Sequence, residues 1–197
     1  GVITAPSFRN DIEHQADIAE EIARFYGYDK IPDRALSGVA DGRYTDRQKL
    51  EKLVTDVMLS EGLSEVCTYT FISPKQYDKL RLPADSPRRD SVKIMNPLGE
   101  DTSIMRTTAV PSMLDVLSRN YNNRNPKAAM FEIAVSFKPR GTKELPEEPK
   151  NIVIGLYGEE YDYFTLKGVI EELLSKTGIT DYDIERVTDD PILHPGR

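Results

Sequence analysis

Two long apolar segments of β type follow each other in this chain with no helix between them, and this order restricts the fold more than any other feature. Residues 128–137 alternate so that four large apolar side chains would share one face of a strand. Residues 151–157 predict a second strand, and the polar, proline-rich residues 138–149 between them indicate a loop. Strands joined by loops favour an antiparallel sheet, so we expect an α+β fold in which helices flank such a sheet.

The other predicted helices and strands do not alternate as regular βαβ units do. Apolar residues at helical spacing predict a first helix over residues 11–28, with Ile18 and Ile22 on its apolar face. Thr45 and Gln48 form a capping-box pattern at the start of a second helix. The remaining expectations are a linker over 33–44, strands over 66–72, 91–95 and 182–187, a short helix from residue 73, and helices beginning at Pro111 and capped by Thr165.

Composition indicates a soluble globular protein. Of the 197 residues, 39% are hydrophobic and 30% are charged, which excludes a disordered chain. We expect no membrane helix, because no apolar run approaches the roughly 20 residues that one needs, and we expect no signal peptide. The single cysteine, Cys67, excludes an internal disulfide and favours a reducing, cytoplasmic compartment. Its apolar surroundings in sequence predict a buried structural thiol.

Charge is distributed unevenly along the chain. The net charge is -7, yet residues 1–140 are balanced, and residues 141–197 hold 6 Lys and Arg against 13 Asp and Glu. An acidic C-terminal part opposes binding to a phosphate backbone there. A small basic cluster, made of Arg81, Arg88, Arg89 and Lys93, is best explained as a solvated loop.

Carboxylates gather on the first predicted helix. Asp17, Glu20 and Glu21 share one helical face, and Asp11 at the start of the helix could bend toward the same point. Four oxygen donors with no cysteine or histidine would suit Mg²⁺ better than a transition metal. Arg24 lies in the middle of the same face, so ordinary surface ion pairs are the competing interpretation, which the spacing alone favours.

Motifs of the common catalytic centres are absent from the sequence. There is no phosphate-binding glycine loop, no dinucleotide fingerprint, no nucleophile elbow and no paired-histidine zinc motif. The two histidines, His14 and His194, lie at opposite ends of the chain. The residues by themselves therefore predict no catalytic site.

Six segments, in order along the chain, resemble blocks of one family, the beta subunit of bacterial phenylalanyl-tRNA synthetase. The run SFRNDIEHQADIAEEIARFYGYDKIP, residues 7–32, is similar to the end of the B5 domain of that family. The later blocks are GLSEVCTYTFIS (62–73), NPLGEDTSIMRTTAVPSMLDVLSRN (96–120), AMFEIAVSF (129–137), DYFTLKGVIEELL (162–174) and LHPGR (193–197). The resemblance predicts the end of a B5-type domain with its linker over residues 1–35 and a C-terminally truncated catalytic-like module over residues 36–197.

The resemblance implies a class II aminoacyl-tRNA synthetase catalytic-like fold and a function in an (αβ)₂ assembly. That assembly joins phenylalanine to tRNA(Phe) with ATP in the cytoplasm, and the alpha subunit performs the chemistry. The family also binds a Mg²⁺ ion through beta-subunit carboxylates at a site shared with the alpha subunit. By motif position, these ligands would be Asp11, Asp17, Glu20 and Glu21 in this sequence.

One departure from the class II pattern predicts that this module is catalytically inactive. Where class II domains carry an Arg that holds the ATP α-phosphate, this chain has Lys138, followed by Pro139 and Arg140. Lysine cannot make the bidentate grip of a guanidinium. The glycine-rich third class II motif is also missing, so no active-site residue is carried over. We expect instead a structural module that contacts the alpha subunit through residues 45–61 and 66–72 and leaves an exposed apolar surface there.

Two other functions remain open from the sequence. The carboxylates could serve a stand-alone Mg²⁺-dependent enzyme, although no nucleophile or oxyanion donor lies near them in sequence. The chain could also be a tRNA-binding module that acts alone, which its net charge of -7 opposes.

Overall fold

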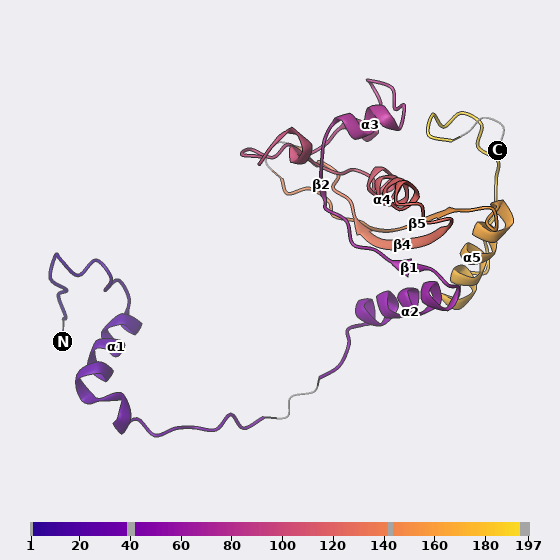
Figure 1. Ribbon diagram of the computed structural model, residues 1–197. Coiled ribbons are helices and arrows are strands. Elements are labelled where there is room, and N and C mark those ends of the chain that lie inside the picture. Colours follow the sequence, from indigo (N-terminus) through magenta and orange to yellow (C-terminus); the bar gives the residue numbers. More distant parts are fainter. Residues whose placement is uncertain (1, 39–41, 142–143, 194–197) are drawn as a thin grey trace. The chain divides into compact units, whose positions relative to one another are not determined.

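The computed structural model describes residues 2–38, 42–141 and 144–193, so the histidine at position 194 and the last four residues of the LHPGR block lie outside it. The chain divides into two compact units, Gly1–Arg43 and Tyr44–Arg197, which are described separately (Figure 1). Within the described ranges, no helix is both long enough and apolar enough to cross a bilayer.

The first unit contains helix α1 (Gln15–Tyr26) and the 3₁₀ turn η1 (Tyr28–Lys30). The helix starts four residues later than the sequence predicts and ends at Gly27, whose φ of 102° lies in the region that favours glycine. No residue of α1 is buried, and Phe25 is 82% exposed. The apolar face expected from the periodicity is therefore present but uncovered within the described part of this unit.

The second unit is built on a sheet with the strand order β1–β4–β5. Strands β4 (Ala128–Val135) and β5 (Lys150–Tyr157) pair antiparallel along eight residues each, as the sequence predicts. Strand β1 (Ser64–Glu65) pairs with β4 in parallel. The α+β class is confirmed, but the sheet is mixed rather than purely antiparallel.

Helices cover both faces of this sheet (Figure 1). Helices α2 (Asp46–Ser60) and α5 (Tyr163–Lys176) pack on the face that carries Phe131, which is fully buried. The core on this side consists of Val54, Val57, Met58, Leu63, Phe131, Val169 and Leu173. Because successive side chains of a strand point to opposite faces, the intervening residues of β4 and β5 lie toward the other side.

Helix α4 (Val110–Asn122) lies on that other face, and its side chains lie close to Gly155 of β5. A Cβ atom at Gly155 would lie 2.6 Å from Leu117 Cδ1 and 2.8 Å from Met113 Cγ. Any side chain at this position would therefore require the side chains of Met113 and Leu117 to move. The absence of a side chain lets α4 rest directly on the sheet.

A smaller two-stranded sheet pairs β2 (Phe71–Ile72) with β3 (Ile104–Met105) antiparallel. Its own cluster of buried side chains consists of Ile72, Tyr77, Leu80, Leu82 and Ile104. The short helix α3 (Lys75–Lys79) and the 3₁₀ turns η2 (Pro87–Arg89) and η3 (Glu100–Thr102) belong to the same region of the unit.

Several local expectations differ from the structure. Of the expected strand over 66–72, only residues 71–72 form a paired strand, β2, while β1 begins before it and Val66 donates one backbone hydrogen bond to Phe131 of β4. Residues 91–95 make a single bridge, between Lys93 and Ile104, and residues 182–187 form no strand. Helix α5 is capped by Asp162, and Thr165 is the third helical residue of that capping box.

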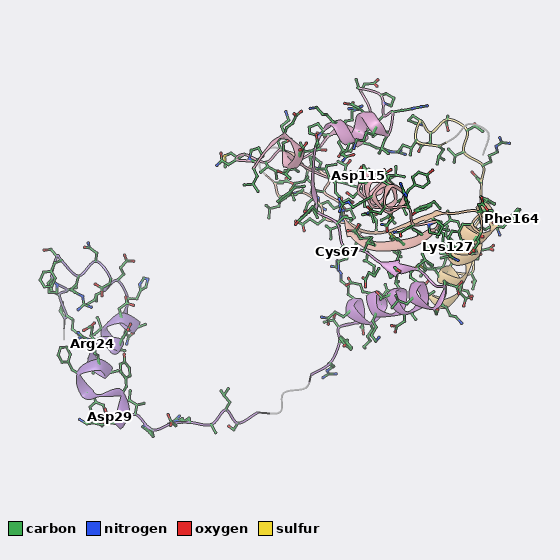
Figure 2. All side chains as sticks on the ribbon, viewed as in Figure 1. Arg24, Asp29, Cys67, Asp115, Lys127 and Phe164 are labelled. Carbon is green, nitrogen blue, oxygen red and sulfur yellow. The ribbon has the colours of Figure 1, made fainter. Side chains whose placement is uncertain are left out.

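Cys67 is exposed rather than buried, on the segment between β1 and β2 (Figure 2). The segment from residue 65 to residue 71 alternates as a strand does, with every second residue exposed. Cys67 belongs to the exposed set together with Tyr69 and Phe71, and only Val66 and Ile72 among its apolar neighbours point to the opposite side.

Candidate functional site

Arg9 joins two of the four carboxylates that the sequence singled out. Its Nε donates to Asp11 Oδ1 at 2.9 Å, and its Nη2 donates to Asp11 Oδ2 at 2.6 Å and to Glu21 Oε1 at 2.7 Å. The side chains of Arg9 and Glu21 are 28% and 24% exposed. A fork of N–H donors thus holds carboxylates that lie ten residues apart in sequence at one point.

Glu21 has a second cationic partner in Arg24, three residues further along α1 (Figure 2). Hydrogen bonds from Arg9 and then Arg24 lower the pKa of Glu21 to about 2. Hydrogen bonds from Arg9 likewise lower the pKa of Asp11 to about 2, and the two carboxylates raise the pKa of Arg9. All three groups are therefore ionised at neutral pH, with the positive charge held between two negative ones.

Asp17 has a different role, at the start of the helix. Its Oδ2 accepts hydrogen bonds from the backbone N–H of Glu13 at 2.9 Å and of His14 at 2.7 Å. These bonds, that from His14 first, lower the pKa of Asp17. Glu20 is exposed and makes no ion pair within residues 2–38.

The four predicted ligands are therefore not assembled in this conformation. Across the described ranges of the chain, no three acidic, histidine or cysteine residues converge closely enough to hold a metal ion. The carboxylates of Asp11 and Glu21 do approach the same point, but the group that they bind there is the guanidinium of Arg9. The donor set still fits Mg²⁺ chemically, because all four groups offer carboxylate oxygens, and Arg9 shows that the gap between Asp11 and Glu21 accepts a cation.

Helical spacing identifies Arg24 as an internal counter-ion of the carboxylates but does not identify Arg9. The signal was available, since Arg9 stands two residues before Asp11 in a turn, where its side chain can fold back. Helical spacing could not reveal it, because Arg9 precedes the helix.

An apolar groove lies beside this cluster in the first unit. It is lined by Ile3, Pro6, Ile12, Ile18, Ile22 and Phe25, with Glu21 at its edge. These are the residues of the uncovered apolar face of α1 and of the segment that precedes the helix.

The second unit exposes apolar side chains on the two elements that sequence analysis assigned to a subunit interface. On α2, Leu50 is 51% exposed and Leu53 is 38% exposed. On the segment between β1 and β2, Tyr69 is 87% exposed, and Phe71 at the start of β2 is 44% exposed. Exposed apolar patches are a common feature of surfaces that bind another protein.

Lys138, which the class II resemblance places at the position of the ATP-binding arginine, follows strand β4. Lys138 pairs through its backbone with Glu147, and the Arg140 guanidinium lies 3.7 Å from the Glu147 carboxylate. Phe137 before it is buried. These residues hold together the loop that follows β4.

Comparison with known proteins gives a consistent result along the chain. The model of the phenylalanyl tRNA synthetase beta chain CLM domain matches residues 31–197, and the tRNA synthetase B5 domain model matches residues 2–28. The phenylalanine–tRNA ligase beta subunit of Clostridium tetani is 44% identical over 197 residues, and that of Clostridium acetobutylicum is 43% identical over 198 residues. Both alignments cover 99% of this chain and 25% of the relative, so the chain spans about a quarter of these proteins.

Solved structures agree on the fold. The crystal structure of pyrrolysyl-tRNA synthetase from Desulfitobacterium hafniense matches with a TM-score of 0.56 at 15% identity, covering 95% of this chain and 65% of that one. A second structure of a pyrrolysyl-tRNA synthetase from the same organism matches with a TM-score of 0.51 at 16% identity, covering 70% of this chain and 47% of that one. At this identity the likeness establishes the class II synthetase fold and nothing further.

Proposed function

The chain belongs to the family of phenylalanyl-tRNA synthetase beta chains, and from this we propose that it supports the ATP-dependent attachment of phenylalanine to tRNA(Phe) by binding the catalytic alpha subunit. In this proposal, residues 1–35 are the end of a B5-type domain and its linker, and residues 36–197 are a catalytic-like module. The assembly is an (αβ)₂ heterotetramer in the cytoplasm, and ATP and tRNA(Phe) are used by the whole enzyme.

The module itself is proposed to be catalytically inactive. Two features of the chain support this. Lys138 stands where class II enzymes place the arginine that grips ATP, and its backbone is tied to Glu147. On the sheet face opposite α2 and α5, helix α4 rests directly on Gly155 and occupies the space above β5.

The observation that carries the proposed role is the exposure of apolar side chains on both predicted interface elements, Leu50 and Leu53 on α2 and Tyr69 and Phe71 after β1, which together are called here the partner surface. Burial of apolar area contributes about 25 cal/mol per Å², which makes such side chains the main source of binding energy once a partner covers them. The proposed partner is the alpha subunit, because a beta subunit is named for its association with one.

The experiment is to mix the chain with purified alpha subunit and follow association by analytical ultracentrifugation. We expect a complex at micromolar concentration, and we expect Leu50→Glu combined with Leu53→Glu to weaken it at least tenfold. Leu145→Glu is the matched control, because Leu145 is 85% exposed outside the partner surface. No association of the unmodified chain, or equal loss in the control, would reject the proposal.

We also propose that Mg²⁺ is held by Asp11, Asp17, Glu20 and Glu21 together with groups of the alpha subunit. The oxygen-only donor set supports this, as does the cation that Asp11 and Glu21 already share. When bound, the ion would neutralise the carboxylates and link the two subunits. The side chains of this chain would supply its ligands, and the proposal assigns them no catalytic step.

A further inference from the structure

The guanidinium of Arg9 and a metal ion would need the same oxygen atoms. Nη2 of Arg9 lies 2.6 Å from Asp11 Oδ2 and 2.7 Å from Glu21 Oε1, and it is the only group within residues 2–38 that contacts both carboxylates. A Mg²⁺ ion binds carboxylate oxygens at about 2.1 Å and tolerates little distortion. Two cationic centres cannot occupy that gap at once.

Arg9 competes with a metal ion for these carboxylates at any physiological pH, because its guanidinium cannot lose its charge. A guanidinium remains protonated at every physiological pH and presents five donors in a fixed plane. Its Nε donates to both carboxylate oxygens of Asp11, and its Nη2 donates to Asp11 Oδ2 and to Glu21 Oε1. The guanidinium of Arg9 is therefore a permanent cation beside Asp11 and Glu21.

We propose that Arg9 is the built-in counter-ion of this carboxylate cluster and that a divalent cation can bind Asp11 and Glu21 only after Arg9 has left them. This inference rests on the proposed metal site. It explains how Asp11 and Glu21, ten residues apart in sequence, are held together in the chain by itself. It also makes Arg9 the residue that sets metal affinity, although Arg9 is not itself a ligand.

Arg24 provides an internal comparison. It pairs with Glu21 but makes no contact with Asp11, and its side chain is 54% exposed against 28% for Arg9. Loss of Arg24 removes the same unit of charge from the same neighbourhood without opening the gap between the two carboxylates. If metal affinity depended only on general electrostatics, removing either arginine would raise it. If the metal must displace a guanidinium from Asp11 and Glu21, only removal of Arg9 raises it.

The experiment measures metal binding to the 197-residue chain and to its Arg9→Gln and Arg24→Gln variants. Mn²⁺ binding is followed by electron paramagnetic resonance, and Mg²⁺ binding by calorimetry. We expect Arg9→Gln to bind either ion about tenfold more tightly than the unmodified chain, because the ion no longer has to displace a guanidinium from Asp11 and Glu21. Arg24→Gln should change affinity less than about threefold, and Asp11→Asn added to Arg9→Gln should abolish the gain.

A second measurement needs no substitution. In the unmodified chain, saturating Mg²⁺ should shift the Nε–Hε NMR signal of Arg9 as its hydrogen bond to Asp11 breaks. An unchanged Arg9 signal in the metal-bound chain would overturn the inference even if a variant failed to fold.

The outcomes separate the two proposals. Equal metal affinity of the unmodified chain and Arg9→Gln would overturn the role of Arg9 and leave the metal site standing. An equal gain in Arg24→Gln would also overturn it, since the effect would then be general electrostatics. If no form of the chain, alone or with the alpha subunit, binds either metal, the metal site itself is rejected and this inference falls with it.

Discussion

Arg106 donates from Nη2 to Glu132 Oε1 at 3.0 Å in the interior of the second unit, where the two side chains are only 1% and 6% exposed. Thr68 completes the network, accepting from Arg106 Nη1 at 2.6 Å and donating to Glu132 Oε2 at 2.7 Å. Arg106 Nε also donates to the carbonyl oxygen of Val135. The network fastens the segment between β1 and β2, the residue after β3, and strand β4 to one another.

Breaking this pair should be costly. Arg106→Met leaves the Glu132 carboxylate buried without its cation, and we expect a loss of about 3–5 kcal/mol in the free energy of unfolding. Urea denaturation followed by circular dichroism measures it. Lys52→Met, which removes one half of the exposed Lys52–Asp56 pair, is the control and should leave the midpoint unchanged. Equal midpoints for the two variants would contradict the structural role of the buried pair.

Two glycines should respond to alanine in opposite directions. At Gly155 a methyl group would collide with Met113 and Leu117, and overpacking of this kind costs about 1–3 kcal/mol. At Gly168, inside α5, a methyl group would meet nothing within 4 Å, and alanine should stabilise the helix by about 0.5–1 kcal/mol. Urea midpoints of both variants test this. A stabilising Gly155→Ala would show that α4 does not rest on the strand.

The Arg9 contacts predict an unusual acid titration. Both carboxylates have a pKa of about 2 in the folded unit, against about 4 when unpaired, so the pairing stabilises the fold above pH 4 and is lost as pH falls toward 2. Carboxyl carbon chemical shifts of Asp11 and Glu21 should show this directly. In Arg9→Gln the midpoint of Asp11 should return to about 4, while that of Glu21 should return less, because Arg24 remains.

Cys67 should react quickly with a thiol reagent in the native chain. It is exposed on the segment that carries Tyr69 of the partner surface. We expect labelling at the rate of a free thiol without denaturant, and protection when the alpha subunit is added in excess. Labelling that needs denaturant would contradict the exposure, and unchanged labelling in the complex would exclude this segment from the interface.

Local sequence signals predicted local structure well. The Thr45 and Gln48 capping box forms as expected, because its reciprocal hydrogen bonds depend only on residues three apart. The β4–β5 hairpin also follows from alternation and a loop. The strand expected over 66–72 is different. Its alternation is real, but a strand also needs a neighbour along its whole length, and in this segment only residues 71–72, β2, form a paired strand.

The carboxylate cluster shows how a small error at a helix end changes a site. A helix starting at residue 11 would place Asp17 in its middle, with its side chain free to join Glu20 and Glu21. The helix starts at Gln15, so Asp17 lies in the first turn and its oxygen is taken by backbone N–H groups of Glu13 and His14. Helix boundaries are poorly defined by periodicity. The spacing therefore predicts the carboxylate face of the helix correctly but does not predict the backbone partners of Asp17.

The mixed sheet also implies an order of events during folding. Strands β4 and β5 are neighbours in sequence, so they can pair on the microsecond timescale of hairpins. Pairing of β1 instead brings Ser64 beside Met130, which closes the long loop between these two residues. The chain loses conformational entropy in closing this loop before any hydrogen bond between the strands forms. We therefore expect the hairpin to be the nucleus of the second unit, with β1 docking last on an edge already in place.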